Sequence, residues 1–128
     1  MSSFPMFLAV AGGGAVGAAG RYAVTLAAAR LFGPAFPWGT LAVNVVGCTL
    51  MGVLVHALAA RGPGGEGLRA FLAVGVLGGF TTFSAFALDL VSLYREKALA
   101  GAALYLAASV VLSVGGLVAG LAIARAWL

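Results

Sequence analysis

Four long stretches with few charged residues constrain the fold of this chain more than any other feature. They cover residues 4–32, 38–60, 69–94 and 98–125, and each is long enough for a helix that crosses a membrane. Only 8% of the residues are charged and 63% are hydrophobic, whereas a soluble domain carries about 25% charged residues. The sequence therefore predicts an all-α integral membrane protein, with residues 1–128 forming a single four-helix transmembrane domain, and argues against a soluble enzyme.

The distribution of the basic residues does not determine the orientation of the chain in the membrane. Four spans place both termini on one side, and three basic residues fall on each side: Arg61, Arg69 and Arg125 against Arg30, Arg95 and Lys97. Either one orientation prevails by a small margin, with Arg21 deciding, or the chain inserts both ways and pairs antiparallel. The net charge of +4 is interpreted as membrane flanking, so no nucleic-acid partner is expected.

Small residues recur four apart in three of the predicted helices. Close helix packing in lipid relies on such spacing, although a sequence rich in glycine also produces it by chance. The candidate pairs are Gly13/Gly17, Gly75/Gly79 and Gly116/Gly120.

The string GGFTTFSAF at residues 78–86 predicts a break near the middle of the third helix. Two glycines followed by two β-branched threonines make a poor helix centre. Irregular backbone at membrane depth is tolerated only where it is buried in protein or lines a polar cavity. Its freed carbonyls could coordinate a cation, and the absence of carboxylates at the break favours a monovalent ion.

Polar side chains at membrane depth are functional candidates because they are costly there. Asn44 in the second span could join two helices or donate to a ligand. Tyr105, Ser109 and Ser113 form one stripe along the fourth helix, and helix–helix hydrogen bonding is the alternative to a polar pathway.

Phe83 and Phe86 share a helix face, which usually indicates packing or lipid contact. Here Thr82 and Ser84 accompany them. Because aromatic rings carry a positive edge, ring edges and hydroxyl donors together could hold a small, hard anion.

Four further residues have more than one interpretation. Arg21 could snorkel or anchor a vestibule, and Asp89 could be a helix-end charge or a partner within a pore. His56 is expected at the membrane interface. Cys48 shares a face with Asn44 and is expected to be a small packing residue.

Four motifs identify a family. GGxxGAxGRY (13–22), WGTLAVNVVG (38–47), GxLGGFTTFSAF (75–86) and YxxxSxxxS (105–113) follow one another in the order and spacing of the fluoride channel family, also called Fluc or CrcB, which the chain resembles over essentially its whole length. The resemblance implies a passive, fluoride-selective channel, not an enzyme, that exports fluoride and protects the cell from its toxicity. It also implies an antiparallel, dual-topology homodimer with two pores, as a multi-pass protein of a bacterial inner membrane.

The resemblance also assigns roles to residues. Phe83, Phe86 and Asn44 match pore residues of the family, and Thr82 and Ser84 lie beside them. Tyr105, Ser109 and Ser113 match the polar track of the family's fourth helix. Gly78 and Thr81 match the positions whose backbone carbonyls hold a structural Na⁺ that is not transported. Arg21 matches an arginine of the first helix and is assigned, with Asp89, to a possible vestibule.

The chain departs from the family pattern at two positions. Ala85 stands where a hydroxyl is frequent, and Asp89 stands where Glu is common. Two other functions are alternatives to a fluoride channel. A proton-coupled exporter of the small multidrug type needs a membrane-embedded carboxylate, which the first helix lacks. A non-transporting assembly protein would use the polar stripes only to join helices.

Overall fold

Four helical spans make up the computed structural model, which describes residues 3–128. The first predicted span corresponds to α1 (Phe4–Phe32), and the second to α2 (Trp38–Ala60). The third span comprises α3 (Glu66–Arg69), η1 (Ala70–Leu77), α4 (Gly78–Phe80) and α5 (Phe83–Arg95), and the fourth is α6 (Leu99–Trp127). All four are long and apolar enough to cross a membrane, which confirms the predicted number of spans.

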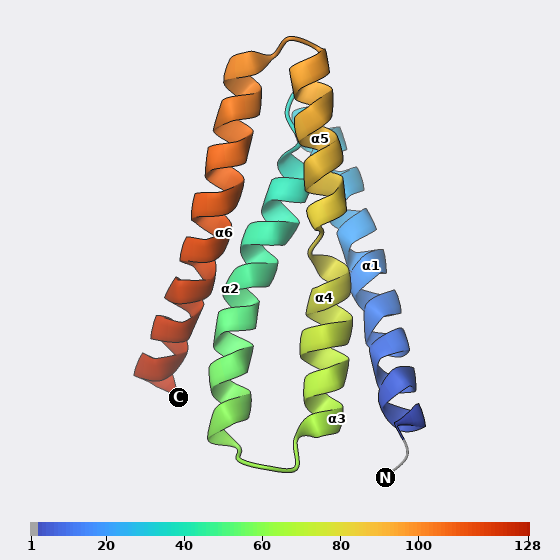
Figure 1. The fold of residues 1–128 in the computed structure, drawn as a ribbon, viewed down its shortest axis with the longest axis vertical. Helices are drawn as coiled ribbons and strands as arrows, with labels where there is room; N and C mark the ends of the chain where they lie inside the picture. The colour runs from blue at the N-terminus through green and yellow to red at the C-terminus, as the bar shows by residue number, and fades with distance from the viewer. Residues whose placement is uncertain (1–2) are drawn as a thin grey trace.

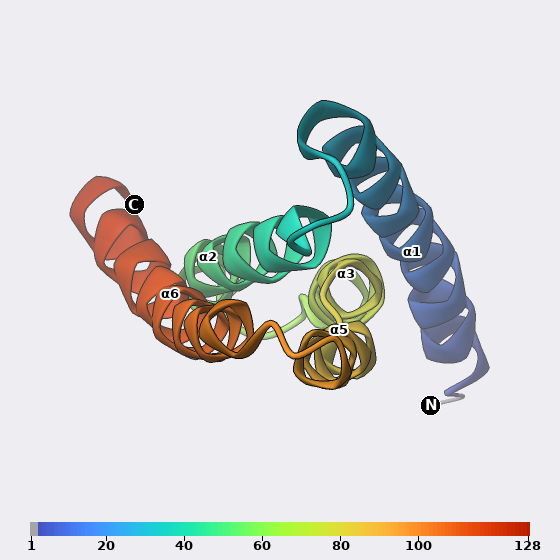
Figure 2. The ribbon, with the colours of Figure 1, turned by 90° about the horizontal axis from the view of Figure 1, so that it is seen from above.

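The helices form an open arrangement with α1 and α6 on its two flanks (Figure 1). Between them lie α2, which packs mainly on α6, and the third span, which packs mainly on α1. Seen from above, α1 and α6 diverge from the central helices (Figure 2). Both termini and the connection after α2 lie towards one end of the molecule, and the other two connections lie at the opposite end (Figure 1).

The third span is one membrane-length segment, Glu66–Arg95, that bends where α4 meets α5. Thr81 (φ −83°, ψ 156°) and Thr82 (φ −154°, ψ 120°) have extended backbone. The Thr82 hydroxyl then caps α5 by accepting a hydrogen bond of 3.1 Å from the Ala85 nitrogen. Before the bend, η1 is a π-helix of eight residues, for which the sequence pattern gives no indication.

Glycines let the backbones approach closely at two interfaces. A methyl group on Gly17 of α1 would overlap the Val76 carbonyl and lie 2.8 Å from the Phe80 nitrogen. On Gly120 of α6 it would overlap the Thr49 carbonyl of α2. All three predicted glycine pairs lie in such contacts, so the interpretation of these pairs as packing sites is confirmed.

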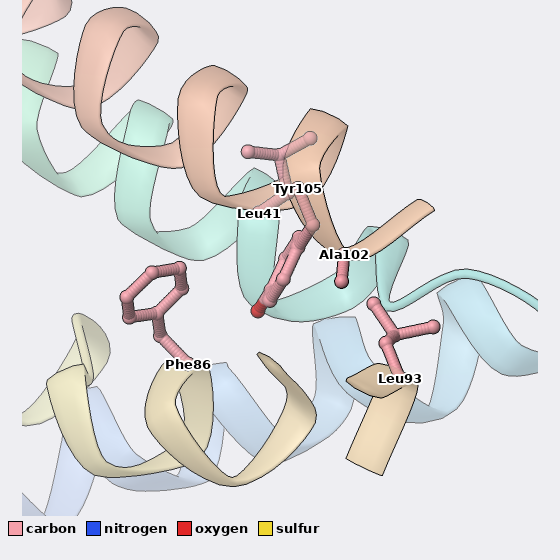
Figure 3. Packing of buried hydrophobic residues seen from close by; sticks show 5 residues of the cluster. All are labelled: Leu41, Phe86, Leu93, Ala102 and Tyr105. Carbon is pink, nitrogen blue, oxygen red and sulfur yellow. The ribbon is translucent and has the colours of Figure 1, made fainter. Parts of the chain in front are cut away.

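The buried apolar cluster is small and sits near the end where α5 meets α6. It consists of Leu41, Phe86, Leu93, Ala102 and Tyr105 (Figure 3). Most other large apolar side chains of the described residues are exposed. Exposed apolar surface on this scale is typical of helices that face lipid or a partner.

Candidate functional site

A cavity of about 290 Å³ lies between α2, the bend of the third span and α6. Polar and aromatic side chains line it together with two valines. The lining residues are Asn44, Cys48, Thr81, Thr82, Phe83, Phe86, Ser109, Val110, Ser113 and Val114. Eight of the residues singled out in the sequence therefore meet at one place, although they come from three separate spans.

Two serine hydroxyls line this cavity without a partner. The side-chain oxygens of Ser109 and Ser113 are buried, and neither has a hydrogen bond to any residue in the described range 3–128. Ser109 is only 6% exposed. A buried hydroxyl without a partner is costly, so these two donors are suited to a ligand that enters the cavity.

Phe83 and Phe86 differ in their surroundings, although they lie side by side. Their ring centroids are 5.5 Å apart with the planes at 52°. Phe86 is buried against Tyr105, at a centroid distance of 5.2 Å. Phe83 is 79% exposed, so most of its ring is left uncovered by this chain.

Asn44 fastens α2 to the bend of the third span. Its Oδ1 accepts a hydrogen bond of 2.7 Å from the Thr82 nitrogen, and its Nδ2 donates one of 3.0 Å to the Thr82 carbonyl. After these two bonds, Asn44 has one N–H left that could donate to a ligand, as the sequence predicts for this amide.

Arg21 makes a similar contact from the other side. Its Nε donates a hydrogen bond of 3.1 Å to the Gly79 carbonyl, which lies at the end of α4. The last carbonyls of a helix have no partner within it, and a cation is favourable there. Arg21 thus lies beside the bend and is not among the residues that line the cavity.

Tyr105 does not line this cavity, unlike the two serines of its stripe. It is fully buried, its ring packs edge-on against Phe36, and its hydroxyl donates to Asp89 Oδ2 at 3.1 Å. Figure 3 shows its ring reaching from α6 into the apolar cluster. Asp89 also lines a second cavity of about 190 Å³ with Thr40, near the end of α1.

The remaining predicted residues surround the bend. Ser84 is exposed and shares a hydrogen bond of 3.3 Å with the Thr82 hydroxyl. The Gly78 and Thr81 carbonyls accept no hydrogen bond within residues 3–128. In an unbroken helix they would accept from the nitrogens four residues later, those of Thr82 and Ala85. Here the Thr82 nitrogen donates to Asn44 Oδ1, and the Ala85 nitrogen donates to the Thr82 hydroxyl. Free carbonyls of this kind are suitable ligands for a hard cation.

Cys48 lines the cavity, although the sequence did not indicate a place for it in the site. It was expected only to pack, yet it lines the cavity one turn after Asn44. The available signal was the shared helix face of the two residues, four apart on α2.

The fold and the cavity define a polytopic helical membrane protein with an aromatic-lined cavity, bordered by hydroxyl groups, at the bend of its third span. The family model of CrcB-like proteins, described as Camphor Resistance (CrcB), matches residues 8–121. The chain belongs to this family.

Three curated relatives are each named fluoride-specific ion channel FluC. The protein of Agrobacterium fabrum is 53% identical over 116 residues, which cover 91% of this chain and 93% of the relative. That of Cereibacter sphaeroides is 54% identical over 121 residues, covering 94% and 95%. That of Rhizobium etli is 56% identical over 118 residues, covering 91% and 94%. The family is one of ion channels and not of enzymes, as the sequence analysis expected.

Proposed function

We propose that this chain forms a fluoride-selective channel through which fluoride leaves the cell passively. The observation that carries the proposal is the pair of unpartnered hydroxyls, Ser109 and Ser113, beside the rings of Phe83 and Phe86 in one cavity. The relatives' shared name supports fluoride as the ion. As a multi-pass protein, the channel would reside in a bacterial inner membrane, where it would protect the cell from fluoride toxicity.

The mechanism replaces the hydration of the anion with weak, fixed contacts. Serine hydroxyls, and the N–H of Asn44 that Thr82 leaves free, can donate to fluoride. The ring edges of Phe83 and Phe86 add a weakly positive surface. Conduction requires binding that is weak enough to release the ion. None of the described residues that line the cavity is basic, so no fixed cation among them would hold the anion there.

We propose that the working unit is an antiparallel homodimer with two pores. Its support is the charge pattern, since each of the two ends of the four-helix bundle carries three basic residues and one acid, Glu66 or Glu96. Exposed Phe83 offers a second copy a surface to cover. Topology reporters fused to the C-terminus should signal on both faces of the membrane, and a signal on one face alone would contradict the antiparallel arrangement.

We propose that the free carbonyls of Gly78 and Thr81 hold a structural Na⁺ that is not transported. Two carbonyls of one chain leave most of a sodium shell open, so a second copy at the dimer axis would complete it. The ion would fix the two bends relative to each other. Replacing sodium with a large organic cation should lower dimer stability and activity, and unchanged values of both would refute the site.

The test of the function is fluoride efflux from proteoliposomes. Vesicles loaded with potassium fluoride are diluted into fluoride-free buffer, valinomycin balances the charge, and a fluoride electrode records the release. Rapid efflux of fluoride with little efflux of chloride is expected. Absence of fluoride efflux from folded, reconstituted protein would exclude the channel, and imposed proton gradients that drive uphill fluoride movement would indicate a coupled exporter instead.

A further inference from the structure

We propose that the thiol of Cys48 is a binding site for soft monovalent metal cations, such as Ag⁺, and that a cation bound there blocks the fluoride pathway. The proposal rests on the proposed function for its blocking effect. Cys48 is the single cysteine of the chain, so the site is defined by one atom per subunit.

The place of Cys48 in the cavity is the first observation. It is half-buried on α2 and lines the same cavity as Ser109 and Ser113 of α6. Asn44 stands one turn before it, on the same face of the helix. A thiol in this position borders the space that the permeating ion would use, and it is not sealed within the apolar cluster.

The second observation is that two hydroxyl groups of α6 line the same cavity without a hydrogen-bond partner within residues 3–128. The Ser109 hydroxyl is buried and has no partner within residues 3–128, although it lines this cavity. The Ser113 hydroxyl is in the same condition. The thiol therefore borders a space in which two polar oxygens are available to a ligand.

The ligand class follows from the atoms that line the cavity. Thiolate sulfur selects soft cations such as Cu(I) among first-row metals, and Ag⁺ is a soft d¹⁰ cation of the same kind. Hydroxyl oxygens of Ser109 and Ser113 would add weaker contacts, and the faces of Phe83 and Phe86 attract cations. A hard cation would gain little here, since none of the lining residues is a carboxylate.

The binding step balances without a further reagent. The sulfur–silver bond forms as the sulfur–hydrogen bond breaks, and the proton passes to water. The thiol and the silver thiolate are both neutral, so the cavity gains no net charge. The block is steric, because the metal occupies the space between the thiol and the two hydroxyls.

The experiment compares the unmodified chain with Cys48→Ser in the fluoride efflux assay. Nitrate replaces chloride, which would precipitate silver. Micromolar Ag⁺ should lower efflux of the unmodified protein at least tenfold, with recovery after excess dithiothreitol. Each rate is divided by the rate of the same protein without silver, so any effect of the substitution itself cancels. Cys48→Ser should lose less than half of its rate.

A second variant controls for the position of the thiol. Val46→Cys in the Cys48→Ser background moves the thiol by two residues, about 200° around α2, to a position that is 49% exposed and outside the cavity lining. Silver is expected to leave its efflux unchanged. Efflux blocked equally in this variant would show that the cavity position is irrelevant and would overturn the proposal.

Intact mass spectrometry reports binding separately from transport. One silver per chain is expected for the unmodified protein and none for Cys48→Ser. Silver bound without block would place the thiol off the pathway, and absence of bound silver would show that the thiol is inaccessible; either result overturns the proposal. Absence of efflux before silver is added would refute the proposed function, while the mass measurement would still test the metal site.

Discussion

The substitution Ser109→Ala tests whether the Ser109 hydroxyl binds the permeating ion or joins two helices. The Ser109 oxygen is buried and unpartnered within residues 3–128. Leaving a buried polar group unsatisfied costs about 1–3 kcal/mol. Removing this hydroxyl should therefore leave the free energy of unfolding unchanged or raise it by about 1 kcal/mol.

The same substitution should slow fluoride. A hydrogen bond to a charged group contributes about 1.5–3 kcal/mol. If the anion makes this contact at the highest barrier of its path, and each 1.36 kcal/mol changes a rate tenfold, efflux should fall about ten- to a hundredfold. The expected variant is thus as stable as the unmodified channel but conducts poorly.

The assay pairs efflux from proteoliposomes with unfolding of the same protein in detergent micelles. Thr25→Val is the matched control for stability, because the Thr25 hydroxyl already donates to the Arg21 carbonyl at 2.9 Å. Loss of that satisfied bond should destabilise by about 0.5–1.5 kcal/mol. The reasoning is refuted if Ser109→Ala loses as much stability as Thr25→Val and keeps its full efflux, since Ser109 would then only join helices.

Three further predictions concern other parts of the site. Asn44→Asp should abolish efflux and lower stability by about 1–3 kcal/mol, because a carboxylate cannot donate to the Thr82 carbonyl; full efflux would show that the amide bonds are dispensable. Phe83→Ile and Phe86→Ile should each lower efflux about tenfold, equivalent to about 1.4 kcal/mol at the barrier, while the protein stays monodisperse; normal efflux in both would make the pair packing residues. Gly17→Ala should destabilise by about 1–3 kcal/mol through overpacking, measured as a lower unfolding midpoint, and an unchanged midpoint would mean that α1 can shift.

The spans were predictable because membrane insertion depends on long apolar stretches. The bounds expected for the first two helices, 4–32 and 38–60, are those observed. The third span begins earlier than predicted, at Glu66. The glycine pairs were also predictable, since packing in lipid rewards small residues.

The π-helix and the hydrogen-bond partners could not be predicted in the same way. Residues 70–77 carry no local signal for a π-helix, which arises where the third span packs closely on α1. The sequence shows that Asn44 and Arg21 can donate hydrogen bonds. It does not show that their acceptors are the backbone carbonyls of Thr82 and Gly79, because that depends on how three spans meet.

These two contacts explain why costly polar side chains are kept at the bend. Extended backbone at Thr81 and Thr82 leaves peptide groups without helical partners, and unsatisfied groups are expensive in lipid. Asn44 satisfies both peptide groups of Thr82, while Arg21 satisfies the Gly79 carbonyl. The carbonyls of Gly78 and Thr81 accept no hydrogen bond within residues 3–128, and the Phe83 ring is 79% exposed. Asn44 and Arg21 thus stabilise the bend in this conformation by satisfying three of its peptide groups.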